Sequence, residues 1–104
     1  MPRYFPDDFL RRLRNEISWP SLLRQLEWPH KRREGQLAFV CPICNEYRSA
    51  VNPRTNLGHC FLPHCKARFN PIEFVMAVTT WDFVTAVHYL QPLLPPGAQR
   101  PASD

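Results

Sequence analysis

The sequence is poor in glycine and has no long apolar run. Only 3 of its 104 residues are glycine, whereas 12 are proline, so we expect stiff connections between its elements. No stretch approaches the roughly 20 apolar residues that a membrane-spanning helix needs. The N-terminal residues also contain no apolar segment of signal-peptide length. These absences predict a cytoplasmic protein with no membrane partner.

The middle of the sequence has few acidic residues. The formal net charge of the whole chain is +4. Residues 30–70 alone carry seven Lys and Arg against two Glu, a net charge of +5. No cluster of carboxylates suited to magnesium ions is present, and no other catalytic constellation is recognised. The sequence therefore predicts a protein that is not an enzyme and that has an anionic partner.

All four cysteines lie in two close pairs. Two residues separate Cys41 from Cys44, and four separate Cys60 from Cys65. Each pair can place two thiolates on one side of a tight turn, and two such turns supply the four ligands of a tetrahedral zinc ion. Disulfides and free buried thiols are the alternatives. Disulfides are rare in the cytoplasm, so we predict one structural Zn²⁺.

Histidines and cations flank the second cysteine pair. His64 is an alternative to Cys65 as the fourth ligand. Otherwise we expect four residues to surround the metal site, where the cations would balance the negative charge of the thiolates: His59, His64, Lys66 and Arg68.

Periodicity and capping residues predict two helices on each side of the cysteine-rich stretch. The first two cover about residues 6–15 and 18–28. Asn70, Pro71 and Glu73 begin the third, and Thr79 with Asp82 forms a capping box for the fourth. Nine apolar side chains are expected to be buried: Phe9, Leu13, Leu22, Leu26, Ile72, Val75, Phe83, Val87 and Leu90.

Strands are predicted at residues 37–40, 47–51 and 57–61, and residues 30–36 are expected to form a basic polar turn. The predicted fold class is α+β. It consists of a small antiparallel zinc-ribbon sheet of three to four strands, flanked by two N-terminal and two C-terminal helices. Residues 1–91 would form this domain, and residues 92–104 a proline-rich disordered tail.

Several short motifs follow a pattern known from one protein family. Cys41-Pro42 with Asn45-Glu46 is similar to a Cys-Pro-Phe-His-x-Glu turn, and residues 59–61 are similar to a Tyr-His-Cys-Phe strand end. Residues 70–76 are similar to Asn-Ala-Ile-Asp-Phe-Leu-Met. The chain thus resembles the N-terminal zinc-binding domain of bacterial and phage DNA primases, as a stand-alone chain without the catalytic domain. It departs from that family at Cys44, where His is usual, and in the wider spacing before Cys65.

The resemblance implies a non-catalytic module that binds single-stranded DNA for template recognition, acting with a primase, polymerase or helicase partner. Six residues are the candidates for DNA contact: Lys31, Arg32, Arg33, Arg48, Arg54 and Tyr47. A solvated basic turn is the alternative for the cations. Phe61 and Phe69 are expected in the core of the sheet. The alternative function is a zinc-stabilised protein-interaction adaptor of a phage or mobile element.

Overall fold

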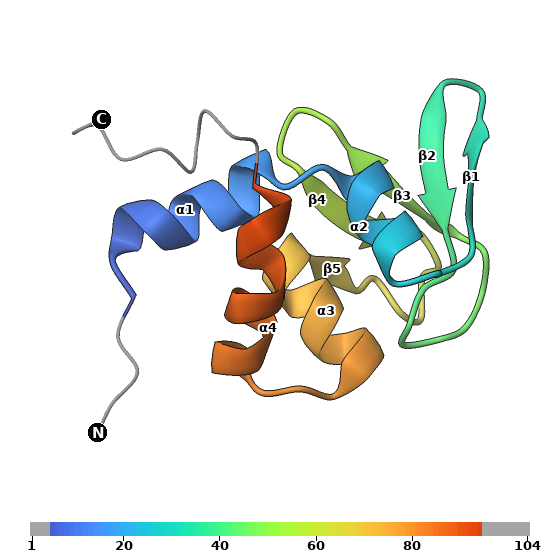
Figure 1. The fold of residues 1–104 in the computed structure, drawn as a ribbon. Helices are drawn as coiled ribbons and strands as arrows, with labels where there is room; N and C mark the ends of the chain where they lie inside the picture. The colour runs from blue at the N-terminus through green and yellow to red at the C-terminus, as the bar shows by residue number, and fades with distance from the viewer. Residues whose placement is uncertain (1–4, 95–104) are drawn as a thin grey trace.

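A computed structural model describes residues 5–94 and confirms the α+β class (Figure 1). Two helices precede the sheet, α1 (Asp7–Glu16) and α2 (Trp19–Gln25), and two follow it, α3 (Pro71–Thr79) and α4 (Phe83–Leu90). The five strands are β1 (His30–Arg33), β2 (Gln36–Phe39), β3 (Ser49–Asn52), β4 (Leu57–Cys60) and β5 (Arg68–Phe69). Within the described residues, no helix is long and apolar enough to cross a bilayer.

The strands form one antiparallel sheet in the order β1-β2-β3-β4-β5. Strand β1 corrects the prediction of a polar turn at residues 30–36. Arg33 pairs with Gln36, and between them Glu34 (φ 51°) and Gly35 (φ 80°) both have the positive φ of a type I′ hairpin turn. Because β1 is an edge strand with mostly exposed side chains, its sequence lacks the apolar alternation that reveals a strand.

Phe74 of α3 lies at the centre of an aromatic core between the helices and one face of the sheet. Its ring centroid is 5.0 Å from that of Trp19 on α2, 5.4 Å from that of Phe39 on β2 and 5.9 Å from that of Phe69 on β5. Gly58 of β4 faces the same core, where a Cβ would lie 2.7 Å from the Phe39 ring. This packing attaches α2 and α3 to the sheet.

Most of the apolar side chains that were predicted to be buried are buried. Phe9 and Leu26 are only partly buried. The prediction for Phe83 was wrong, because its side chain is 39% exposed and its ring packs against Phe5 at the molecular surface. The other six side chains are buried: Leu13, Leu22, Ile72, Val75, Val87 and Leu90.

The helix starts are largely as predicted. Ser18 accepts a hydrogen bond from the Ser21 N–H at the start of α2, and Asn70 with Glu73 forms the capping box of α3. Asp82 caps α4 through the Thr85 N–H, but Thr79 has no part in this cap, because it is the last residue of α3.

The ordered fold continues past the predicted boundary at residue 91. A 3₁₀ turn covers Gln91–Leu93, and Leu94 is buried. The rest of the predicted tail, residues 95–104, lies outside the described residues.

The turn between β3 and β4 is bound to the junction of α1 and α2. The Asn56 side-chain amide donates hydrogen bonds to the carbonyl oxygens of Arg14 (2.9 Å) and Ile17 (3.1 Å). In return, the Trp19 indole N–H donates to the Asn56 carbonyl oxygen over 2.9 Å. These bonds hold the far end of the sheet against the helices.

Candidate metal centre and nucleic-acid interface

The first cysteine pair lies on a tight turn between β2 and β3. The Cys41 N–H donates to the Glu46 carbonyl oxygen (2.9 Å), and the Asn45 N–H donates to the Cys41 carbonyl oxygen (2.8 Å). Asn45 has a positive φ of 62°, which asparagine tolerates better than most residues. The turn therefore presents Cys41 and Cys44 on one side.

The second pair lies on an equivalent turn between β4 and β5. The Cys60 N–H donates to the Ala67 carbonyl oxygen (2.8 Å), and the Lys66 N–H donates to that of Leu62 (3.0 Å). Lys66 has a φ of 52° and follows Cys65, as Asn45 follows Cys44. The wider spacing of the second pair thus lengthens the turn without changing how it ends.

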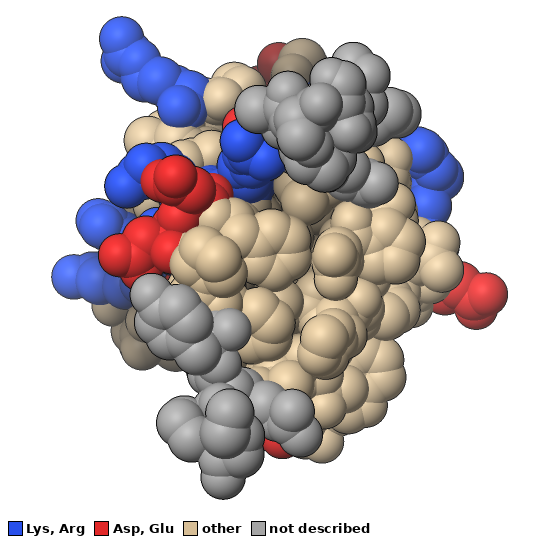
Figure 2. Space-filling model, turned by 60° about the vertical axis from the view of Figure 1, so that its left-hand side comes forward, with Lys and Arg blue, Asp and Glu red and all other residues tan. Residues whose placement is uncertain are grey.

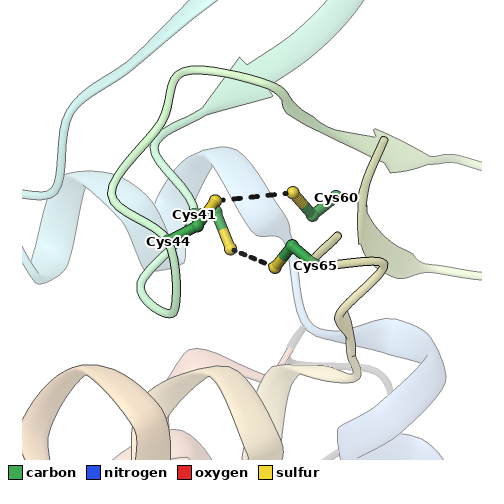
Figure 3. A group of neighbouring side chains, drawn as sticks. All are labelled: Cys41, Cys44, Cys60 and Cys65. Atoms are coloured by element: carbon green, nitrogen blue, oxygen red, sulfur yellow. Dashed lines mark hydrogen bonds between the residues drawn. The ribbon is translucent and has the colours of Figure 1, made fainter. Parts of the chain in front are cut away.

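The two turns bring the four cysteine sulfurs together (Figure 3). All four lie within 4.8 Å of one another. The sulfurs of Cys41 and Cys65 are 3.7 Å apart, as are those of Cys44 and Cys60. A tetrahedral site with metal–sulfur bonds of about 2.3 Å requires sulfur–sulfur distances of about 3.8 Å. The disulfide alternative is wrong, since all four cysteines are free. We call these four residues the cysteine cluster.

The thiols of the cluster differ in how readily they ionise. Burial raises the pKa of Cys44 to about 12. The Ala67 amide favours the thiolate of Cys65, but burial and the neighbouring sulfurs outweigh it and raise its pKa. Burial also opposes ionisation of Cys60, yet the Leu62 amide and neighbouring side chains lower its pKa. Since metal ions bind thiolates, uptake of a metal would displace protons from this cluster.

Ser49 is a polar residue beside the cysteine cluster, and the sequence did not predict its position there. Its hydroxyl oxygen is buried without a conventional hydrogen bond within residues 5–94. It faces Cys60 across the β3–β4 pair and lowers the pKa of that thiol. A buried hydroxyl aimed at a sulfur is suited to stabilise a metal-bound thiolate.

The residues expected around the metal are divided between two sides of the sheet. His64 is exposed on the second turn and does not belong to the cysteine cluster, and Lys66 is exposed next to Cys65. His59 and Arg68 are cross-strand partners. Because side chains alternate along a strand and Cys60 faces the sulfurs, His59 and Arg68 point to the opposite face.

That opposite face forms a surface without helices, which we call the open face. One row of paired residues crosses it: Lys31, Ala38, Ala50, His59 and Arg68. Two hollows of about 550 Å³ and 180 Å³ lie on it, and only strand, turn and loop residues line them. The open face is therefore accessible to a ligand.

Four cations lie on the open face. Arg33 and Arg48 line the smaller hollow, and Arg68 lines the larger one. The ammonium of Lys31 lies 4.6 Å from the ring centroid of Tyr47. None of the four forms an ion pair with an acidic side chain within residues 5–94.

The structure separates the other two predicted DNA contacts from this group. Arg32 pairs with Leu37 on the other face of the sheet and lines a third hollow beside Trp19. Arg54 is exposed on the β3–β4 turn, where its N–H donates to the Asn52 side chain. Of the predicted set, Lys31, Arg33, Arg48 and Tyr47 thus share one surface, and Arg68 joins them.

Phe61 stands between the two hollows and contributes to the lining of both. Its side chain is 58% exposed, so the prediction that it lies in the core was wrong, whereas Phe69 is buried as predicted. The exposure of Phe61 could have been predicted from the sequence. Successive side chains of a strand point to opposite faces, so when the ligand Cys60 points inward its two neighbours, His59 and Phe61, point outward. The rings of His59 and Phe61 are 4.9 Å apart.

A second surface has few charges. Figure 2 shows the side of the molecule on which α1 and α4 lie, where the middle of the face carries neither Lys and Arg nor Asp and Glu. Trp81 and Phe83 are each 39% exposed, and the Trp81 ring packs edgewise on that of Tyr89 at 5.2 Å.

The sequence matches no model of a known protein family and no curated protein. The resemblance to primase zinc-binding domains therefore stays a prediction from the motifs.

Proposed function

We propose that this chain is a non-catalytic zinc-ribbon module that binds single-stranded DNA on its open face. The observation that carries the proposal is the group of cations there, which have no acidic partner within residues 5–94. Anionic phosphates are the complementary ligand, and their neutralisation releases counterions. The resemblance to primase domains supports DNA as the source of those phosphates.

The cysteine cluster would hold one zinc ion. Four thiolates at tetrahedral separation are the donor set that zinc prefers in structural sites. The metal would tie the β2–β3 turn to the β4–β5 turn and so hold four of the five strands in register. Its part in the function would be to keep the open face rigid.

The module would act together with another protein. Three or four phosphate contacts provide little affinity, since non-specific binding at physiological salt has a Kd of roughly 10⁻⁴–10⁻⁶ M. Tethering to a primase, polymerase or helicase would raise the effective concentration of the module at the template. Template recognition for primer synthesis is the role that fits such a partner.

Salt-dependent binding of a labelled single-stranded oligonucleotide tests this proposal. The variant Arg33→Gln/Arg48→Gln/Arg68→Gln should bind more weakly, with a salt slope lower by about 2, because each phosphate contact on a single strand contributes about 0.7. The matched control is Arg11→Gln/Arg12→Gln/Arg24→Gln, which removes the same charge from α1 and α2. The control should bind like the unchanged chain, and both variants should retain their metal.

Two results would contradict the proposal. Absence of DNA binding at low salt, together with tight capture of a protein, would favour the adaptor alternative. Its candidate surface is the uncharged middle of the side on which α1 and α4 lie. Primer synthesis by the isolated chain would overturn the non-catalytic assignment.

A further inference from the structure

We infer that Phe61 is a wedge that separates two adjacent bases of a bound strand, with one base in each of the hollows beside its ring. The inference rests on the proposed function and adds to it the mode in which the bases are held. It concerns only unpaired strands, because the bases of a duplex are already stacked and paired.

The position of Phe61 carries the inference. Its ring belongs to the wall of both hollows, and it is 58% exposed. Gln36 and Ala50 also border both hollows, so the two hollows are adjacent. An exposed ring between two spaces can stack on a base in either one. In the larger hollow the His59 ring lies 4.9 Å from that of Phe61, so a base there would displace the His59 ring.

The hollows lie over two small side chains of the sheet. Ala38 and Ala50 pair across β2 and β3 in the middle of the open face. Both alanines are buried, with exposed fractions of 7% and 6%, so a base would contact the side chains that border the hollows and not the sheet itself. The outer walls are aromatic, with His59 in the larger hollow and Tyr47 in the smaller one.

Phe61 rather than Tyr47 is the stacking residue. The Lys31 ammonium lies over the Tyr47 ring at 4.6 Å from its centroid, so one face of that ring is already occupied by a cation–π contact. Tyr47 is also partly buried, whereas Phe61 is exposed. Tyr47 therefore bounds the smaller hollow and positions Lys31.

Guanidinium groups lie on both sides of the wedge. Arg33 and Arg48 border the smaller hollow, and Arg68 borders the larger one. A strand whose bases occupy the two hollows would thus have a cation near the phosphates on each side of the separated step. This arrangement holds the strand by its backbone while Phe61 holds its bases.

A probe with one pair of adjacent 2-aminopurines, flanked by abasic nucleotides, tests the inference directly. Stacked 2-aminopurines produce an exciton signal in circular dichroism, and separation of the two bases removes it. Binding of the unchanged chain should abolish the exciton signal. The Kd of the complex is measured by titration at low salt. Phe61→Ala should bind about 5- to 100-fold more weakly, the range expected for loss of base–aromatic stacking. Phe61→Trp keeps an aromatic ring at this position and should bind as tightly as the unchanged chain.

The matched control is Ile43→Ala. Ile43 is 60% exposed, like Phe61, but lies on the first cysteine turn and lines neither hollow. Its loss should leave both the affinity and the exciton change as in the unchanged chain. The salt slope of Phe61→Ala should also be unchanged, because no cation is lost.

The outcomes separate the wedge from the proposed function. If Phe61→Ala binds as tightly as the unchanged chain while the Arg33, Arg48 and Arg68 variant binds weakly, DNA binding stands and the wedge is wrong. An exciton signal that persists in the complex of the unchanged chain likewise overturns the wedge. If no single strand binds at low salt, the proposed function fails and the wedge fails with it.

Discussion

At the scale of single residues, the cysteine cluster depends on more than its four sulfurs. The Ser49 hydroxyl is buried beside Cys60 and has no conventional partner within residues 5–94. An unpaired buried hydroxyl lowers stability, so its position is favourable only if the sulfur accepts its hydrogen bond. A thiolate accepts such a bond far better than a thiol, which couples Ser49 to metal binding.

We expect Ser49→Ala to weaken metal affinity by about 10-fold, the lower end of the range for residues that support metal ligands. Competition with a chromophoric chelator measures this change. Ala50→Ser is the control, because its side chain faces the other side of the sheet. An unchanged affinity in Ser49→Ala would mean that the hydroxyl does not contact the bound thiolate.

At the scale of elements, two contacts hold the sheet to the helices. Asn56 binds the β3–β4 turn to the end of α1 through two donated hydrogen bonds. Phe74 of α3 packs against aromatic rings from α2, β2 and β5. The first contact is polar and lies at the end of the sheet, and the second is apolar and lies at its centre.

Asn56→Gly should lower the free energy of unfolding by about 1–3 kcal/mol, because two hydrogen bonds are lost while the positive φ of 58° is still allowed. Asn56→Ala should cost roughly 1 kcal/mol more, since alanine is strained in that backbone conformation. Chemical denaturation of both variants measures the difference. Equal stability of Asn56→Gly and Asn56→Ala would mean that the positive φ imposes no strain on alanine at this position.

Phe74→Ala should destabilise the fold by about 3–5 kcal/mol, the usual cost of removing a buried aromatic ring. Phe83→Ala is the matched control, because the same ring is deleted from a side chain that is 39% exposed, and its cost should be clearly smaller. Thermal melting of the two variants compares them. A similar loss of stability in both would mean that the aromatic core is not centred on α3.

At the scale of the whole molecule, the cysteine cluster and the aromatic core lie on the same side of the sheet. Cys41 and Cys60 are completely buried in the core, together with Phe39 and Phe74. The cysteine cluster is therefore part of the packing, and loss of a metal bound there should affect the entire domain. The open face lies on the other side, so that a ligand there would not need to disturb the core.

Removal of the metal should unfold the domain. Structural zinc sites supply about 10 kcal/mol or more, which is comparable to the whole stability of a domain of this size. Elemental analysis should find one zinc per chain, and addition of a chelator should abolish the near-ultraviolet circular dichroism of the buried Trp19. Cys41→Ser and Cys60→Ser should have the same effect. A chelated chain that retains its melting transition would refute a structural role for the metal.

The sequence by itself determined the features that depend on local spacing. Two cysteines on one tight turn form half of a metal site wherever the turn lies, so the candidate ligands could be predicted without knowing how the strands pair. The cap formed by Asn70 and Glu73 is likewise decided within four residues. The buried side chains of α1 and α4 were predictable except near the helix starts, where Phe9 is only partly buried and Phe83 is exposed.

Only the tertiary structure decided which residues share a surface. Arg32 and Arg33 are neighbours in the sequence, yet they lie on opposite faces once residues 30–33 form an edge strand. Strand β1 has no apolar pattern of its own, so its existence and register depend on pairing with β2. The exposure of Phe61, by contrast, follows from local alternation, because Cys60 points to the core and its neighbour points outward. Strand pairing joins residues that are distant in the chain, and local patterns do not contain that information.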